Sequence, residues 1–352
     1  MMDDPFYIQW HITNLCNLRC KHCYQDDFSK NGDLDWARLR RISDNILFTM
    51  KEWDRTACIH LTGGEPLLKP EMFLLLEELN RRSEVHEVGI ITNGTLADHD
   101  RIGKLSTFSK LKKLKISIDG ADAATNDSIR PEGTFRRVIE NVLRIRKEKR
   151  FEISFMFTMM RRNFRNIPSI IHLCQDLGVD GLILERFIPW GQGRRIMDEV
   201  LSREEWKEMV GTLLSLFSIE FVGQEILPYQ AFQVFFHGDE PELLGAPCVI
   251  GRDGMCVMPE GSVFPCRRFP VSIGNLLKEP LKQVWEKSEI LTHLGKKENL
   301  KGKCGKCELS DCRGCRSLAL SLTGDYLEED PHCWHFATPP SPKIQSFLET
   351  NT

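Results

Sequence analysis

Eleven of the thirteen cysteines in this 352-residue chain fall into two groups whose spacing suits metal chemistry. The first group, Cys16, Cys20 and Cys23, lies within eight residues in the segment CNLRCKHC. Polar residues between the thiols disfavour a buried helical stripe, since such a stripe would place them in a core. Three thiolates suit an iron–sulfur cluster that keeps one iron open to a ligand, as catalytic zinc sites keep an open position. A zinc site would need a fourth ligand, for which His22 is the only nearby candidate.

The second group occupies short, turn-rich sequence toward the C-terminus and contains Cys248, Cys256, Cys266, Cys304, Cys307, Cys312, Cys315 and Cys333. A small module of this kind buries little apolar area and is usually stabilised by metal. The pairs CGKC and CRGC could be halves of a zinc ribbon, but only four residues separate them, against the usual ~15–20. Eight thiols instead fill two [4Fe–4S] clusters. The remaining Cys58 and Cys174 are expected to be small buried hydrophobic residues.

Composition indicates a globular protein. The chain is 41% hydrophobic with 25 Gly and 17 Pro, which excludes a mainly disordered or collagen-like protein. An acidic N-terminus and the absence of a long apolar run predict a cytoplasmic protein with no membrane partner. In a reducing compartment, close-spaced cysteines bind metal more often than they form disulfides. A net charge of −3 gives no reason to expect a nucleic-acid partner.

Alternating strands and helices must position the first cysteine group. Strands are predicted at Phe6–Thr13, Cys58–Thr62, Glu87–Thr92, Leu114–Ile118, Ile153–Thr158 and Gly181–Phe187. Helices are predicted at Leu34–Met50, Glu71–Ser83, Phe135–Lys149 and Arg203–Phe217. Six βα units favour a partial (β/α)6 barrel over an open sheet. The cysteine loop then follows the first strand, at the end of the barrel where active sites collect.

The domain organisation follows from a change in composition after residue 190. We expect a barrel domain over residues 1–220, a linker over 221–247, a cysteine-rich domain over 248–335 and a tail over 336–352. The strand–helix alternation stops at Cys248, where the second cysteine group begins.

The CxxxCxxC loop after the first strand of a partial barrel resembles the radical S-adenosylmethionine (SAM) superfamily. The segment Thr62-Gly63-Gly64-Glu65-Pro66 looks like the GGEP turn of that family, which receives the SAM ammonium group. Other matches to the SAM contacts of the family stand at or after strand ends: Asn93, Ser117, Asp119 and Arg130. The resemblance implies that Arg130 pairs with the SAM carboxylate.

The resemblance also implies the cofactors and the chemistry. A [4Fe–4S] cluster on Cys16, Cys20 and Cys23 binds SAM through its amino and carboxylate groups. An electron, supplied by a donor such as ferredoxin or flavodoxin, then cleaves SAM. The resulting 5′-deoxyadenosyl radical takes a hydrogen atom from the substrate, while the protein positions the reactants and excludes solvent.

The second cysteine group resembles the SPASM domain of radical SAM maturases, so the expected fold is an α/β partial (β/α)6 TIM-like barrel followed by a small Cys-rich iron–sulfur SPASM domain. The resemblance places one auxiliary [4Fe–4S] cluster on Cys248, Cys256, Cys266 and Cys315, and a second on Cys304, Cys307, Cys312 and Cys333. The compact run is CxxCxxxxCxxC, one residue shorter in each later gap than the common family pattern. The membership of the ligands is therefore better supported than their pairing.

The residues after Cys266 bear on the substrate. In the sulfatase-maturing branch the next residue is an aspartate thought to act as a base, whereas this chain has Arg267 and Arg268. The catalytic base is therefore unassigned. The two arginines either hold a substrate carboxylate by bidentate hydrogen bonds or form a solvated basic turn.

Two substrate classes remain, and the first is a peptide or protein modified by a maturase, which we favour. The second is tetrapyrrole side-chain chemistry, because the C-terminal segments resemble radical SAM haem-biosynthesis enzymes: Cys312-Arg313-Gly314-Cys315-Arg316, Thr323-Gly324-Asp325 and Asp330-Pro331-x-Cys333. Non-enzymatic alternatives are an iron–sulfur electron carrier and a zinc-stabilised binding module. Neither has a use for the GGEP turn.

Overall fold

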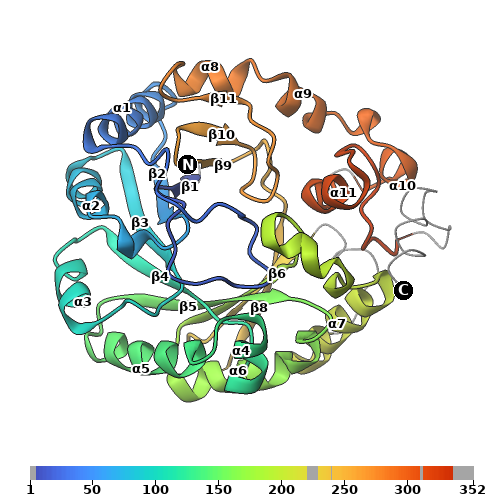
Figure 1. Ribbon diagram of the computed structural model, residues 1–352. Coiled ribbons are helices and arrows are strands. Elements are labelled where there is room, and N and C mark those ends of the chain that lie inside the picture. The colour runs from blue at the N-terminus through green and yellow to red at the C-terminus, as the bar shows by residue number, and fades with distance from the viewer. Residues whose placement is uncertain (1–4, 220–228, 239, 310–311, 336–352) are drawn as a thin grey trace.

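The computed structural model describes residues 5–219, 229–238, 240–309 and 312–335, and the predicted tail at 336–352 lies outside these ranges. Six parallel strands form its centre: β1 (Phe6–His11), β2 (Ala57–Thr62), β3 (Val85–Thr92), β4 (Leu111–Ser117), β5 (Glu152–Met159) and β6 (Gly181–Arg186). Each pairs with the next strand along the chain. This order is that of a (β/α) barrel rather than a doubly wound sheet, and Figure 1 shows the curved sheet inside a ring of helices. The predicted strands and the partial barrel are confirmed.

Helices cover the outside of the sheet: α1 (Trp36–Glu52), α2 (Glu71–Arg81), α3 (His99–Leu105), α4 (Ala123–Ile129), α5 (Thr134–Lys147), α6 (Ile167–Leu177) and α7 (Arg203–Leu216). The four predicted helices are confirmed to within two residues at each end. Two of the four start with side-chain caps, in which side-chain oxygens accept bonds from backbone N–H groups that have no partner in the helix. Asp35 caps α1, and Ser202 and Glu205 form a capping box on α7. Bounds were not predicted for α3, α4 and α6, although helices were expected between the strands and at Cys174.

The two faces of β1 have different surroundings. One packs against the covering helices in the hydrophobic core, and the other faces the space that the sheet encloses. Phe6, Ile8 and Trp10 are almost fully buried and belong to the main hydrophobic core, which extends to the covering helices. Tyr7 and Gln9 alternate with them and line a cavity inside the barrel. The interior therefore offers polar groups to a ligand instead of a filled apolar core.

The segment 221–247, expected to be a linker, contains two strands, β7 (Tyr229–Phe235) and β8 (Glu242–Pro247). β7 pairs antiparallel with β6, and β8 pairs antiparallel with β7. The inward side chains Phe232 and Val234 belong to the main core. These strands extend the barrel sheet because the free edge of β6 needs a hydrogen-bonding partner; the domain limits themselves stay a prediction.

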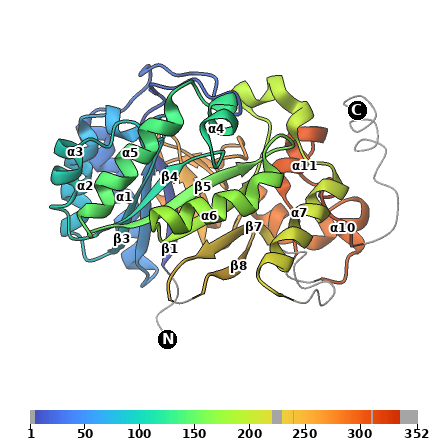
Figure 2. The ribbon, with the colours of Figure 1, turned by 90° about the horizontal axis from the view of Figure 1, so that it is seen from below.

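The C-terminal region closes the other edge of the sheet. β9 (Gly254–Val257) pairs parallel with β1, β10 (Ser262–Phe264) pairs with β9, and β11 (Gly274–Asn275) pairs with β10. The described strands thus form one sheet in the order β11-β10-β9-β1-β2-β3-β4-β5-β6-β7-β8. Short helices follow: α8 (Leu281–Glu286), α9 (Glu289–Gly295), α10 (Gly302–Lys306) and α11 (Arg316–Thr323). In Figure 2, α10 and α11 lie on the same side of the sheet as α7.

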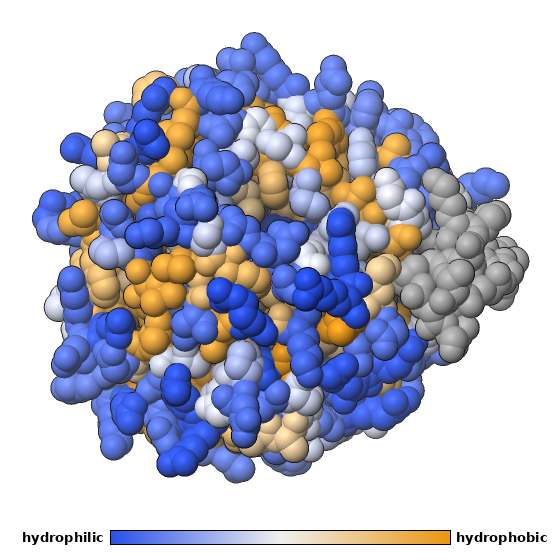
Figure 3. Space-filling model, in the orientation of Figure 1, coloured by the Kyte–Doolittle hydropathy of each residue, from blue (hydrophilic) through white to orange (hydrophobic). Residues whose placement is uncertain are grey.

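The surface has no membrane-crossing feature among the described helices, since none is long and apolar enough to span a bilayer. Hydrophilic residues predominate around the rim of the face drawn in Figure 3, with hydrophobic residues exposed between them nearer the centre.

Candidate active site

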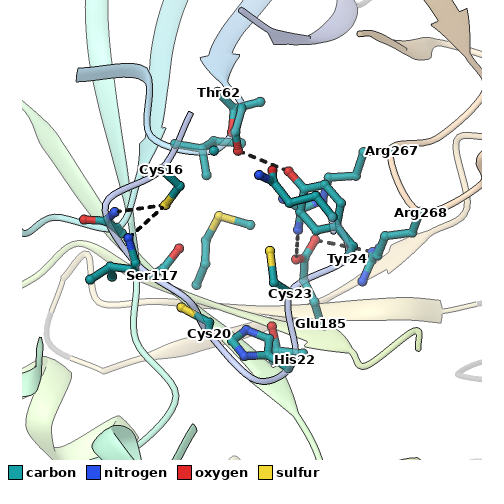
Figure 4. A pocket seen from close by; sticks show the side chains of 18 of the residues that line it. Cys16, Cys20, His22, Cys23, Tyr24, Thr62, Ser117, Glu185, Arg267 and Arg268 are labelled. Atoms are coloured by element: carbon teal, nitrogen blue, oxygen red, sulfur yellow. Dashed lines mark hydrogen bonds and ion pairs between the residues drawn. The ribbon is translucent and has the colours of Figure 1, made fainter. Parts of the chain in front are cut away.

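The loop after β1 brings its three cysteines to one cavity of about 910 Å³. Cys16, Cys20 and Cys23 all line it, and Figure 4 shows their sulfur atoms pointing toward a common space. Burial raises the pKa of Cys20 to about 11 and that of Cys23 to about 12. Thiols bind metal as thiolates, and a metal centre supplies the positive charge that offsets the cost of burying a thiolate. The donor set therefore fits an iron–sulfur cluster.

A close approach between two loops holds the cysteine loop in place. The Gly64 N–H donates to Thr13 O and the Glu65 N–H donates to Leu15 O, both at 2.8 Å. A Cβ on Gly63 would lie 2.2 Å from Thr13 O, and one on Gly64 would lie 2.4 Å from Leu15 O. No side chain fits at these distances. The Gly–Gly pair thus lets the backbone approach the cysteine loop, which is a role the sequence did not indicate.

Glu65 lies behind the cavity wall and is fully buried. Its carboxylate accepts hydrogen bonds from the backbone N–H of Leu67, the hydroxyl of Thr92 and the backbone N–H of Asn93, at 2.8–3.1 Å. Burial raises the pKa of Glu65 to about 7, although these hydrogen bonds act to lower it. Neither Glu65 nor Pro66 lines the cavity, so the structure assigns Glu65 to fixing the loops after β2 and β3.

Other predicted SAM contacts do line the cavity. Asn93 and Ser117 stand at the ends of β3 and β4, and Asn93 Nδ2 lies 3.8 Å from Cys16 Sγ. Arg130 also lines the cavity, with Nη1 3.8 Å from Cys20 Sγ. Gly63 and Gly64 complete this wall.

Asp119 is fully buried beside Arg130 rather than on the cavity. Its Oδ2 forms an ion pair with Arg130 Nε at 2.7 Å and lies 3.3 Å from His22 Nε2, and its Oδ1 accepts a bond from the Thr158 N–H. Burial lowers the pKa of His22 to about 4, although the carboxylate acts in the opposite direction. His22 is therefore neutral at pH 7 and oriented by Asp119.

The second cysteine group divides into two sets. Four thiols line one small cavity: Cys304, Cys307, Cys312 and Cys333. Four others line a large cavity of about 1320 Å³ inside the sheet: Cys248, Cys256, Cys266 and Cys315. The division is the one that the family resemblance implies. Two polar links run between the sets, since the Asp330 carboxylate accepts from the Cys315 N–H and the Asp330 N–H points to Cys304 Sγ.

Among the residues that the structure describes, no group of three or more His, Cys, Asp or Glu side chains is placed to hold a metal ion. In an iron–sulfur cluster each thiolate binds a different iron, whereas a zinc ion takes all its ligands on one metal. Cys174 is buried as expected, whereas Cys58 is half-buried and lines a cavity at the floor of the barrel.

Arg267 and Arg268 are ion-paired, so the solvated basic turn is wrong. Arg267 Nη2 lies 2.7 Å and Arg268 Nη2 lies 3.5 Å from the Glu185 carboxylate, and the arginine side chains are 13% and 20% exposed. Figure 4 shows all three beside the cysteine loop. They line both the cysteine cavity and the large cavity, and the other residues common to both walls are Met156, Arg186 and Ile188. The two cavities therefore adjoin.

Sequence reasoning missed several of these groups. Glu185 and Arg186 end β6, and Lys115 lies inside β4. From the sequence these residues are assigned to strands, with no further role. Asp330 pairs with Arg186 at 2.9 Å across 144 residues. A signal was present for two of them, because the alternation of β4 and β6 places Lys115 and Glu185 on the face opposite the core. Arg186, the next residue after Glu185, falls on the other face, and no local signal indicated its role.

Comparison with known proteins adds independent evidence. Residues 10–174 match the family model of the radical SAM superfamily, and residues 248–308 match the model of SPASM, an iron–sulfur cluster-binding domain. An AdoMet-dependent heme synthase of Methanosarcina barkeri (strain Fusaro / DSM 804) is 32% identical over 356 residues, which cover 95% of this chain and 97% of the relative.

Two further similarities concern maturases. The mycofactocin maturase MftC of Mycobacterium tuberculosis (strain CDC 1551 / Oshkosh) is 26% identical over 94% of this chain and 83% of the relative. The crystal structure of Streptococcus suis SuiB bound to precursor peptide SuiA shares the fold, with a TM-score of 0.68 at 13% identity over 95% of this chain and 75% of that chain. The family matches, the heme synthase relative and the cysteine cavity at the end of the parallel strands agree: this chain belongs to the radical SAM superfamily and is a radical SAM enzyme with a C-terminal SPASM domain.

Proposed function

We propose that this enzyme modifies carboxylate-bearing side chains of an iron tetrapyrrole by radical SAM chemistry. The observation that carries the proposal is the large cavity beside the cysteine cavity. Apolar residues line much of it, including Met156, Ile183 and Met255, and the cations Lys115 and Arg267 also face it. An apolar macrocycle with carboxylate groups at its rim matches this combination.

Residues of the cysteine cavity have separate roles in this proposal. Cys16, Cys20 and Cys23 would hold the [4Fe–4S] cluster, the Gly63 and Gly64 backbone would receive the SAM ammonium group, and Arg130 would pair with the SAM carboxylate. When bound, the cluster and SAM supply a 5′-deoxyadenosyl radical that takes a hydrogen atom from the substrate.

Relatives support a tetrapyrrole over the peptide that the sequence favoured. The M. barkeri heme synthase matches almost the whole of this chain at higher identity than MftC. The resemblance of the C-terminal segments to haem-biosynthesis enzymes agrees with this difference in identity. A peptide remains the second candidate, because the MftC similarity also spans 94% of this chain.

We also propose two auxiliary [4Fe–4S] clusters, one on each set of four thiols. Holoenzyme reconstituted anaerobically with iron and sulfide should then bind about 12 irons per chain. After reduction with dithionite, SAM should be cleaved to 5′-deoxyadenosine.

The substrate test compares iron coproporphyrin with its methyl ester in this reduced holoenzyme. The free acid should increase the yield of 5′-deoxyadenosine and change in mass, as measured by liquid chromatography and mass spectrometry. The ester lacks the carboxylates and should do neither. Cys16→Ala should abolish SAM cleavage with either compound, because it removes one of three cluster ligands.

Two results would contradict the proposal. Equal turnover of the acid and the ester would show that the carboxylates are not recognised. Turnover of a precursor peptide, with no response to any tetrapyrrole, would favour the second candidate.

A further inference from the structure

The interior face of β4 presents three side chains at successive depths. Ser117 lines the cysteine cavity, Lys115 lines the large cavity, and Lys113 lines only the polar cavity at the floor of the barrel, which Lys115 also reaches. Side chains on one face of a strand are about 6.6 Å apart along the chain. The Lys115 side chain therefore starts one such step below the end of the strand, where Ser117 faces the cysteine cavity.

Lys113 and Lys115 differ in their partners. Lys113 Nζ lies 3.1 Å from a Glu87 carboxylate oxygen and 3.8 Å from a Glu152 oxygen. Lys115 Nζ has no hydrogen bond or ion pair to any residue in the described ranges, and its contact is with the Tyr7 ring, whose centroid lies 5.6 Å away. Burial lowers the pKa of Lys115 to about 8, with the Glu185 carboxylate acting in the opposite direction. The ammonium is thus mostly charged at pH 7, and leaving it without a counter-ion costs stability.

The charges around Lys115 leave a positive excess. Glu185 already pairs with Arg267 and Arg268, so three cations share one carboxylate. Arg186, on the same wall, is neutralised by Asp330.

The other titratable groups near Lys115 add one negative charge. Burial lowers the pKa of His60 well below its usual value and raises that of Tyr7. His60 and Tyr7 are therefore neutral at pH 7, and they hydrogen-bond to each other at 3.1 Å. Glu87 and Glu152 share one cation, Lys113, so one of their two negative charges is not balanced. One positive charge therefore remains in excess among these groups, and Lys115 is the cation among them that lines the large cavity without a carboxylate in contact.

We infer that Lys115 binds a carboxylate of the substrate and fixes how deeply the substrate sits below the cysteine cavity. This inference rests on the proposed function and adds a specificity-determining residue to it. The alternative is that Lys115 binds no substrate group and is solvated only by water in the floor cavity.

The test measures binding, independently of turnover. Iron coproporphyrin is titrated into anaerobic holoenzyme and followed by its absorbance, for wild type, Lys115→Met, Lys115→Arg and the control Lys113→Met. Lys115→Met should raise the Kd at least about tenfold, as expected when one partner of a buried charge pair is removed. Lys115→Arg should recover most of the affinity. Lys113→Met lies on the same strand face outside the large cavity and should bind as wild type.

A stability measurement accompanies the titration. Without ligand, Lys115→Met should unfold at the wild-type temperature or above, because it removes a half-buried cation that no carboxylate contacts. With iron coproporphyrin, wild type should gain thermal stability and Lys115→Met should gain less. A solvated lysine would change neither the Kd nor this gain.

The outcomes separate the two proposals. Tight binding by wild type together with an unchanged Kd for Lys115→Met overturns the role of Lys115 and leaves the proposed function standing. An equal loss of affinity in Lys113→Met also overturns it, because the effect would then be general. If wild type cleaves SAM but binds no iron coproporphyrin, the proposed function and this inference both fail.

Discussion

At the scale of single residues, the site depends on buried charges that are held by counter-ions. Asp119 is fully buried, forms an ion pair with Arg130 and lies beside the neutral His22 ring. A buried ion pair contributes little net stability, but removing one partner leaves an uncompensated charge. Asp119 is therefore a positioning residue for Arg130, and it does not itself line the cysteine cavity.

Asp119→Asn should weaken SAM binding and destabilise the protein. We expect the Kd for SAM to rise about tenfold and the free energy of unfolding to fall by about 3 kcal/mol, because Arg130 loses its counter-ion. Equilibrium dialysis with labelled SAM and urea unfolding measure the two quantities. The control Glu140→Gln breaks an exposed pair with Arg136 and should change neither by a measurable amount. Normal SAM binding by Asp119→Asn would show that Arg130 needs no such support.

At the scale of elements, two loops share one backbone interface. The Gly63–Gly64 turn after β2 packs on the backbone of residues 13–15, immediately before the cysteines. Glu65 then ties the same turn to the loop after β3 through Thr92 and Asn93. The C-terminal ends of β1, β2 and β3 are thereby fixed to one another, and these contacts hold the cysteine loop in place.

Gly64→Ala should displace the cysteine loop. The new Cβ would meet the carbonyl oxygens of Asn14 and Leu15 at 2.4–2.5 Å, and backbone atoms cannot move away cheaply. We expect a loss of about 1–3 kcal/mol in unfolding free energy, with fewer irons bound and little SAM cleavage. Gly103→Ala in α3 is the matched control, since its Cβ meets nothing within 4 Å and alanine favours a helix by about 1 kcal/mol. Wild-type iron content in Gly64→Ala would refute the loop interface.

At the scale of the whole molecule, the C-terminal region completes the sheet and faces the barrel interior. β9 pairs with β1, and residues of both regions line the large cavity. Asn45 of α1 fastens the two regions outside the sheet. Its side-chain amide donates to Leu276 O and Glu279 O, and its oxygen accepts from the Leu281 N–H that begins α8.

Asn45→Ala should loosen this attachment. It leaves three backbone groups without partners, and each such loss costs about 1 kcal/mol or more. We expect an unfolding temperature several degrees lower and faster proteolysis within the C-terminal region, followed by mass spectrometry. Asn299→Ala removes one exposed bond to His293 O and should behave as wild type. Equal behaviour of the two variants would mean that β9 alone secures the region.

The sequence alone determined the features that depend on neighbours along the chain. The six parallel strands and four covering helices follow from periodicity and caps, since these depend on residues only a few positions apart. The same holds for the spacing of Cys16, Cys20 and Cys23. β7 and β8 were missed because their strand character comes from pairing with β6.

Only the tertiary structure decided which distant groups meet. It placed Glu185 against Arg267, about eighty residues away, and it left Lys115 without a carboxylate partner while Lys113 has two. It also placed the Glu65 carboxylate behind the cavity wall, where it accepts hydrogen bonds from Thr92 and Asn93. These outcomes depend on the register between strands and on how loops close over the barrel, and local residue spacing does not encode either.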